Sequence, residues 1–488
     1  MFYYKITILD NKKCKLETDD DELFDDLRDY LSYKIPGVEY TKAFKRGWDG
    51  KKFLLAKSGM FSIGLLDLTK NFLKQRGIIP PVTDRRPPVI TNDSIDIKDK
   101  LKKLKLIPRE HQVRILQKVI KHDRGIVRSC TGSGKSVCTA MATAEFNKPT
   151  IIYVIGIDLL KQFHDLFSAI FDEKIGMIGN GVCDIERINI ASIWTIGSAL
   201  KISKNDILID EDKEEDEADD NNVEKIINML RDAKIHIFDE SHTVTTNTIN
   251  QIYKQINPER IYGFSGTPYR DDIDNLSIHS ILGRQIINIS ASELIQKGIL
   301  AQPIIKFVDV PPLGTTYPSY QGIYKNFIVD NDVRNNLIVK EVESLLEKGY
   351  LTLVLYKQIR HGKKLYKMLN SVGIKTEVLS GDDSLERRTE VKEMLMDKKI
   401  QVILASTIFD LGVDIPALSG LVLCGGGKSS IRALQRIGRV IRGYPGKKFA
   451  AIVDFYDRAK FLRSHSKIRC KIYASEEGFR VIKCKNMK

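Results

Sequence analysis

The sequence predicts an α/β protein in which two parallel-sheet domains follow a smaller α/β unit. Short and almost wholly apolar runs recur after residue 105, and each leads into a polar or glycine-rich stretch and then a longer helical segment. That alternation is typical of βαβ units, whose strands are buried on both faces. A second series of runs starts after residue 330, and 488 residues are too many for one ordinary core.

The first domain is expected over residues 1–88. Alternating apolar residues predict a strand over 2–9, and amphipathic spacing predicts helices over 20–33 and 63–75. Between the two helices, residues 48–55 are expected to form a turn that runs into a strand. Two Pro-Pro pairs then predict a linker over 79–88.

The two parallel-sheet domains are expected over 105–300 and 335–456, joined near 300–335, with a basic C-terminal segment over 457–488. In the first of them, strands are predicted at 125–127, 150–155, 188–192, 234–238 and 260–264. In the second, strands are predicted at 351–356, 375–379, 401–405, 421–424 and 450–455.

The charge of the chain indicates a polyanionic partner. The net charge is +14, even though residues 210–220 contain nine carboxylates. That acidic stretch cannot bury apolar surface and is expected to be an exposed, solvated insertion. A basic protein of this size most often binds nucleic acid, although a merely soluble basic surface would give the same charge.

Composition also excludes several classes of protein. No run of 18 apolar residues is present, so a membrane span is not expected. The seven cysteines include no C-x-x-C pair, which favours a reducing cytoplasm over a disulfide framework or a zinc site. The expected location is the cytoplasm.

A glycine-rich loop follows the run at 125–127 and precedes a helical stretch at 137–146. A loop between a strand and a helix N-terminus is the context in which backbone N–H groups cradle nucleotide phosphates. Lys135 would reach the β- and γ-phosphates, and the Ser136 hydroxyl would bind Mg²⁺. The predicted ATP-binding residues here are Thr131, Gly132, Ser133, Gly134, Lys135 and Ser136.

Two carboxylates end the apolar run at 234–238. Acidic residues at the carboxyl edge of a parallel sheet lie where ligands bind in such folds. Asp239 is expected to hold Mg²⁺ through its water shell, and Glu240 is expected to orient the attacking water. An Asp-Glu pair after a strand is usually a solvated turn, but its pairing with Lys135 favours the catalytic interpretation.

Arginines far along the chain complete the predicted nucleotide site. Arg439 and Arg442 are three residues apart and follow Gln435, so on a helix they share one face. An arginine delivered to the γ-phosphate stabilises the charge of the transition state. An ordinary basic helix is the alternative. Upstream of the loop, Gln112 is expected to contact adenine through its amide, with Arg109 supporting it.

Taken together, these segments resemble the superfamily 2 helicases and translocases over residues 105–456. The resemblance implies two RecA-like motor domains around an ATP and Mg²⁺ site. It assigns Gln112 to the Q motif, Lys135 and Ser136 to motif I, 239–242 to a DExH-type motif II, 265–267 to motif III and 435–442 to motif VI. It further implies nucleotide-linked roles for His242, Gly412 and Asp414 and strand contacts at Thr195 and Thr407.

A closer resemblance is to the phage UvsW-type recombination helicases, carried by Gly47–Gly50 before a basic strand and by His361–Lys363. It implies an N-terminal domain that binds double-stranded DNA, with Trp48, Lys51 and Lys52 as candidate contacts. Trp48 in a hydrophobic core is the alternative. The implied activity is ATP-driven remodelling of branched DNA, including junction migration, fork regression and unwinding of D-loops or R-loops. Recombination and single-strand-binding proteins are candidate partners, and RNA–DNA hybrids are candidate substrates. If a phage encodes the chain, the expected location is the cytoplasm of the host.

Three other functions remain open at this point. An RNA helicase would carry the same motifs. A motor subunit of a restriction-type complex would need a nuclease site or a partner chain, and residues 1–100 contain no convincing nuclease site. A nucleic-acid-binding scaffold with a dead ATP site is disfavoured because Lys135, Glu240 and Arg439 are all present.

Overall fold

The computed structural model describes most of the chain, which folds into two compact units. The first unit is residues 1–129 with 134–288, and the second is residues 130–133 with 289–488. The described residues are 2–35, 38–40, 42–89, 92–203, 219–241, 246–266, 275–314, 317, 319–380, 383–406, 415–427 and 430–487.

A four-stranded sheet with the order β5-β2-β1-β6 opens the first unit. Its strands are β1 (Tyr4–Ile8), β2 (Lys13–Thr18), β5 (Met60–Ser62) and β6 (Val82–Asp84), and its helices are α1 (Asp21–Tyr30), η2 (Ile63–Leu65) and α3 (Leu66–Gln75). The apolar faces of these elements close a core that includes Ile6, Leu16, Leu27, Leu65 and Leu73. The strand predicted at 2–9 and the helix predicted at 63–75 are therefore present.

Two predictions for this region need correction. The helix expected to reach residue 33 ends at Tyr30, because the next residues form β3 (Ser32–Lys34) and pair with β4 (Lys51–Phe53). The linker expected over 79–88 contains β6, which pairs in parallel with β1. Three exposed residues suffice for β6 because the edge of an existing sheet supplies its hydrogen-bond partners.

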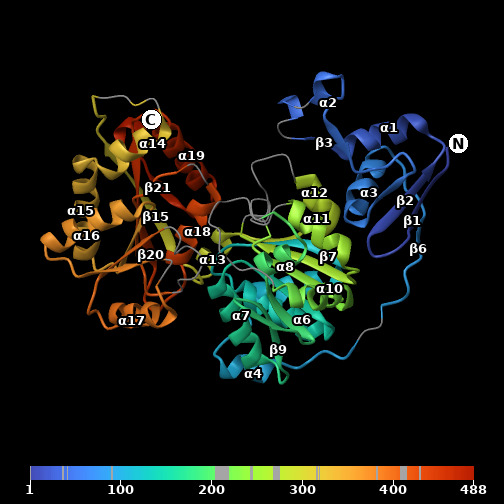
Figure 1. Cartoon of the computed structure of the whole chain (residues 1–488), viewed down its shortest axis with the longest axis horizontal. Coiled ribbons are helices and arrows are strands. Elements are labelled where there is room, and N and C mark those ends of the chain that lie inside the picture. Colours follow the sequence, from blue (N-terminus) through green and yellow to red (C-terminus); the bar gives the residue numbers. More distant parts are fainter. Residues whose placement is uncertain are drawn as a thin grey trace. The chain divides into compact units, whose positions relative to one another are not determined.

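The pair β3–β4 belongs to a small piece that also holds η1 (Val38–Tyr40) and α2 (Lys42–Lys45). Figure 1 shows this piece standing apart from the four-stranded sheet. Its turn depends on Gly50, which has φ +74° and lies so close to Val38 that an added Cβ would approach its Cγ1 to 2.6 Å. The turn and strand predicted over 48–55 are therefore present.

An eight-stranded sheet with the order β10-β9-β11-β8-β12-β13-β7-β14 forms the rest of the first unit. Its strands are β7 (Arg124–Ser129), β8 (Thr150–Val154), β9 (Ile175–Gly179), β10 (Val182–Asp184), β11 (Ile188–Ser192), β12 (Ile235–Asp239), β13 (Arg260–Ser265) and β14 (Gln285–Ile289). The strands β8, β11 and β12 are buried at every position, as expected for parallel strands covered on both faces.

The helical segments of this part connect the strands. They are α4 (Lys98–Lys103), α5 (Glu110–Lys121), α6 (Lys135–Phe146), α7 (Ile157–Ile170), α8 (Ile193–Ala199), η3 (Asp220–Asn222), α10 (Val223–Asp232), α11 (Thr246–Gln255) and α12 (Asn275–Leu282). The next helix, α13 (Ala291–Gln296), belongs to the second unit. Among the described residues no helix is both long and apolar enough to cross a membrane.

The N-terminal sheet domain is docked on α12. Gly64 lies against the end of this helix, where an added Cβ would be 2.3 Å from the carbonyl oxygen of His279 and 2.4 Å from that of Ser280. Leu276 joins the apolar core of the N-terminal domain. An ion pair of 2.8 Å joins Arg284 to Asp67. Close packing against the main chain, burial of an apolar side chain and an ion pair therefore all hold the N-terminal sheet domain on the first unit's larger sheet domain.

The second unit contains a seven-stranded sheet with the order β17-β18-β16-β19-β20-β15-β21. All of its pairings are parallel. Its strands are β15 (Gln302–Val310), β16 (Thr352–Tyr356), β17 (Thr376–Leu379), β18 (Val402–Ser406), β19 (Gly420–Leu423), β20 (Phe449–Asp457) and β21 (Arg480–Ile482).

Helices cover both faces of this sheet. In Figure 1, α15 and α16 lie on one side of β15 and β20, and α18 and α19 lie on the other. The helical segments are α14 (Tyr320–Tyr324), η4 (Lys325–Val329), α15 (Asp332–Glu347), α16 (Ile359–Ser371), α17 (Leu385–Met396), α18 (Ser430–Val440), α19 (Leu462–Ser475) and η6 (Lys485–Met487). Both large sheets thus have the α/β architecture that the sequence predicts.

Two stretches that were predicted to lie outside the second parallel-sheet domain contribute strands to its sheet. The stretch near 300–335, expected to join the domains, contains β15, which pairs with β20 along its whole length. The basic segment over 457–488 contains α19 and the edge strand β21.

Two buried ion pairs fix helices to β20. Asp454 accepts hydrogen bonds from Nε and a terminal nitrogen of Arg469, both at 2.8 Å, and from the Tyr473 hydroxyl at 3.0 Å. Arg334 donates to Asp457 at 2.8 Å through Nε. These four charged side chains are almost wholly inaccessible to solvent. A charge buried in this way is tolerable only while its partner is present.

We therefore expect Asp454→Ala to destabilise the second unit by about 3–5 kcal/mol, because Arg469 would keep a buried charge without its counterion. Glu390→Ala is the control, since it removes a carboxylate from the largely exposed pair with Arg387 and should cost about 0–1 kcal/mol. Hydrogen–deuterium exchange of β20 peptides would measure both changes. Equal protection of β20 in the two variants would contradict this assignment.

Candidate active site

The glycine-rich loop lies between β7, which ends at Ser129, and α6, which begins at Lys135. Gly132 and Gly134 have φ angles of +85° and +83°, which favour glycine. Ser133 is wholly buried within the turn, while Thr131 and Ser136 are partly exposed. In a strand–loop–helix arrangement of this kind, the N-terminus of the helix faces the loop and favours an anion there.

The acidic residues lie at the same edge of the sheet as this loop. The strand β13 lies between β12 and β7, and the parallel register pairs Asp239 with Phe264 and Ser265 with Arg128. The carboxyl ends of all three strands therefore meet at one edge, as the sequence predicts.

An ion pair connects the loop with the carboxylates. Lys135 Nζ lies 2.8 Å from Oε1 of Glu240, and the two side chains are 11% and 20% exposed. Glu240 has φ +46°, a left-handed conformation that is unfavourable for a side chain of this kind. Strained residues cluster at functional sites, where the surrounding structure holds them in place. The structure thus brings the predicted lysine and glutamate into direct contact.

Asp239 has the properties expected of a group that supports a cation. It ends β12 and is buried, and its Oδ1 atom has no hydrogen-bond partner among the described residues. Burial, and next the neighbouring Glu240 carboxylate, raise the pKa of Asp239, while Lys135 opposes the rise. An unsatisfied carboxylate oxygen in this position fits a hydrated Mg²⁺ ion, because that ion prefers oxygen ligands and retains much of its water.

Gln112 lies over the start of α6. Its Oε1 atom accepts a hydrogen bond from the backbone N–H of Arg109 at 2.9 Å. On the other side, an added Cβ at Gly134 would lie 2.3 Å from Nε2 of Gln112. The structure therefore joins the predicted adenine-contacting residues to the phosphate loop by direct packing.

The predicted arginines lie in the second unit. The helix α18 carries Gln435 and Arg439, and Arg442 follows the helix and forms an isolated bridge with Leu300. Loop residues 130–133 are part of the same unit: an added Cβ at Gly132 would lie 3.3 Å from Cγ of Arg442.

Several predictions fall outside the described residues. These are the roles of His242, Thr267, Thr407, Gly412 and Asp414. Most of the acidic stretch at 210–220 lies outside them as well. Thr195 is described and lies in α8, where it is buried.

The candidate DNA contacts of the N-terminal domain are at its surface. Trp48 is 40% exposed, so it does not occupy the core position that was the alternative for it. Lys51 forms an ion pair with Asp29. Lys52 is exposed, and its Nζ atom lies 5.9 Å from the centre of the Tyr33 ring.

Other basic residues on the same small piece had not been predicted as contacts. Lys34, Lys45 and Arg46 are exposed and accompany Trp48 on the segment built from β3, α2 and β4. The signal was present in the sequence, because residues 42–52 contain five Lys or Arg and one acid. Such a cluster beside an aromatic residue is typical of surfaces that bind nucleic acid.

Three family models match the chain in succession. The model "DNA helicase UvsW, N-terminal" matches residues 4–78, "Type III restriction enzyme, res subunit" matches 105–270, and "Helicase conserved C-terminal domain" matches 334–444.

Two relatives match over longer stretches. The chain is 25% identical over 510 residues to the ATP-dependent DNA helicase uvsW of Enterobacteria phage T4, covering 96% of this chain and 97% of that protein. It is 27% identical over 365 residues to helicase 22 of Sulfolobus islandicus filamentous virus, covering 70% of this chain but only 62% of the viral protein.

A solved structure supports the fold of the motor domains. Dbp5 of Saccharomyces cerevisiae, bound to RNA and ADP BeF3, matches with a TM-score of 0.52 at 15% identity, covering 79% of this chain and 92% of that chain. The succession of family models and the arrangement of the predicted site agree with one another. The chain is a UvsW-like helicase of superfamily 2, an ATP-hydrolysing enzyme with two RecA-like domains behind an N-terminal domain.

Proposed function

We propose that this chain is an ATP-dependent DNA helicase that remodels branched DNA, by junction migration, fork regression and the unwinding of D-loops or R-loops. The main support is the docking of the N-terminal domain on α12, a helix of the first motor domain that follows the Ser265 segment. A duplex held by the N-terminal domain would then move with the motor. A protein with that connection can pull one arm of a junction while it holds another.

The residues at the sheet edge supply the hydrolytic chemistry in this proposal. Lys135 and the N–H groups at the start of α6 bind the phosphates, and Glu240 orients the attacking water. Mg²⁺, held by Ser136 and through water by Asp239, would neutralise charge on the β- and γ-phosphates. Arg439 and Arg442 would add positive charge at the γ-phosphate, and Gln112 would contact the adenine. Gly412, Asp414 and His242 remain proposed nucleotide-linked residues.

The decisive experiment compares ATPase stimulation by forks, four-way junctions, plain duplex, single strands and RNA. Stronger stimulation by branched DNA than by plain duplex is the expected result, and preference for RNA would replace the proposal with an RNA helicase. The match of residues 105–270 to a restriction-enzyme subunit favours one further alternative, a motor subunit of a restriction-type complex. That function requires a nuclease partner, so remodelling by the purified chain alone would exclude it.

The Lys135–Glu240 pair gives a first prediction. Lys135→Ala should weaken ATP binding and abolish hydrolysis, because the charge that holds the phosphates is lost. Glu240→Gln should abolish hydrolysis but still bind ATP, since the amide keeps the shape and cannot act on water. Lys148→Ala and Glu259→Gln are matched controls, because they disrupt an ion pair of the same unit that is buried to a similar extent. Normal turnover in Glu240→Gln would disprove the role of this carboxylate.

A second prediction concerns the arginines. Arg439→Ala and Arg442→Ala should leave nucleotide affinity nearly unchanged, while at least one lowers kcat by roughly 10³-fold or more. The reason is that an arginine at the γ-phosphate acts mainly on charge that develops in the transition state. Arg387→Ala, on the surface of α17, is the control. Wild-type hydrolysis by both variants would show that neither arginine serves catalysis.

A third prediction separates the N-terminal domain from the motors. A chain lacking residues 1–88 should keep basal ATPase activity but lose junction remodelling and its preference for forks. Trp48→Ala should weaken binding to duplex DNA with unchanged thermal stability, because the ring is at the surface. Trp194→Ala provides the contrast: this other tryptophan is buried in α8, and its loss should cost about 3–5 kcal/mol of stability. Full junction migration by the truncated chain would remove the N-terminal domain from the mechanism.

A further inference from the structure

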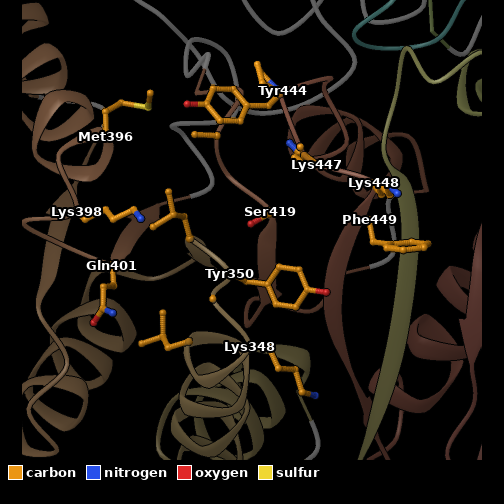
Figure 2. Close-up of a pocket in the computed structure, with 16 residues that line it drawn as sticks. Lys348, Tyr350, Met396, Lys398, Gln401, Ser419, Tyr444, Lys447, Lys448 and Phe449 are labelled. Carbon is orange, nitrogen blue, oxygen red and sulfur yellow. The ribbon is translucent and has the colours of Figure 1, made fainter.

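A cavity of about 670 Å³ opens at the amino-terminal edge of the sheet in the second unit (Figure 2). The strands β16, β18, β19 and β20 are parallel, so the residues that precede or open them gather at this edge. Tyr350, Gln401, Ser419 and Phe449 line the cavity in this way. It lies at the opposite edge of the sheet from the segment between β19 and α18 that leads to Gln435 and Arg439.

The lining of the cavity is strongly basic. Among the described residues, its lining contains Lys348, Lys398, Lys447 and Lys448 and no carboxylate. Lys348 follows the end of α15, and Lys398 follows α17 in a left-handed conformation with φ +58°. The amino groups of Lys348, Lys398 and Lys448 form no ion pair with any described residue, and all three side chains are exposed.

Lys447 differs from the other three lysines. Its Nζ atom donates hydrogen bonds to the carbonyl oxygens of Pro416 and Leu418, each at 2.7 Å. Burial, and next the charge of Arg442, lower the pKa of Lys447 to about 8. Lys447 therefore stabilises the rim of the cavity through these two hydrogen bonds, whereas the other three lysines can bind a ligand.

Aromatic rings accompany these lysines. Tyr350, Tyr444 and Phe449 line the same cavity, and the rings of Tyr444 and Phe449 are 40% and 45% exposed. Figure 2 shows Tyr444, Tyr350 and Phe449 on different sides of the opening, with Lys398 extending toward the space between them. A cavity that groups exposed rings with lysines suits a ligand that has both flat apolar faces and negative charge.

We propose that this cavity binds a single-stranded segment of nucleic acid, with phosphates on Lys348, Lys398 and Lys448 and bases stacked on the rings. Such pairing of a basic groove with aromatic faces is what sequence-independent binding of single strands requires. Bases in a duplex are already stacked on one another, so only an unpaired strand offers its faces to these rings. The choice of DNA rests on the proposed function. A strand displaced from a junction is the substrate class that fits.

Photochemical crosslinking tests the location of the strand directly. The full-length chain is irradiated with a single-stranded oligodeoxynucleotide that carries 5-bromodeoxyuridine, and the linked peptides are identified by mass spectrometry. Crosslinks on peptides that contain Tyr350, Tyr444 or Phe449 are the expected result. If crosslinks form elsewhere on the chain but never on these peptides, the assignment of the cavity is wrong.

Binding measurements test the lysines and the rings. The double variant Lys348→Ala/Lys398→Ala should reduce the slope of log affinity against log salt for that oligonucleotide by about 1.4, at about 0.7 per lost phosphate contact. Tyr444→Ala should weaken binding about fivefold or more. The matched control is Lys340→Ala/Lys392→Ala, which removes two exposed lysines of α15 and α17 away from the cavity.

Basal ATPase activity should be unchanged in all of these variants, which shows that they are folded. If the cavity and control variants lose the same amount of affinity, the effect comes from general surface charge and the proposal is wrong. The two proposals fail separately. If branched DNA stimulates the ATPase activity of the wild-type chain no more than plain duplex does, the proposed function is wrong. If the cavity variants bind single strands with wild-type affinity, only the inference about the cavity is wrong.

Discussion

The parallel register of β7, β13 and β12 is the constraint on which the candidate site depends. It brings the end of the phosphate loop's strand and the end of the acidic strand to one edge, although more than 100 residues separate them in the chain. Lys135 and Glu240 can then form an ion pair, and Glu240 can be held in its unfavourable backbone conformation. A shift of one residue in the register of β12 would turn Asp239, its last residue, to the other face of the sheet.

The parts of the fold that could be predicted are those with a strong local signal. Parallel strands buried on both faces read as apolar runs, so β8, β11, β12 and β16 were evident from the sequence. Two of the strands that escaped prediction had a weaker signal. β6 is three exposed residues that pair only because β1 is adjacent, and β15 begins with Gln-Pro and carries Lys306 at an exposed position. Their formation depends on partners that are distant in the chain.

The residues of the candidate site could be predicted from the sequence, whereas most of the contacts between them are seen only in the structure. The contact between Lys135 and Glu240 followed from motif chemistry. By contrast, the packing of the Gln112 amide on Gly134 depends on how α5 lies against α6. The exposure of Trp48 could not be read from its neighbours, since a tryptophan after a glycine suits a core and a surface equally. The basic cavity of the second unit gathers residues from four separate loops, and no local pattern predicts that.

Several contacts between the N-terminal domain and the first motor domain use main-chain carbonyl groups. Lys12 donates to the carbonyl oxygen of Lys254, Arg124 donates to that of Asn11, and Gly64 rests against two further carbonyls at the end of α12. Every residue type presents the same carbonyl group, so substitutions at the accepting positions leave those acceptors in place. Such an interface is tolerant of sequence drift. The position of the N-terminal domain on the first motor domain can therefore be the same in relatives whose surface residues differ.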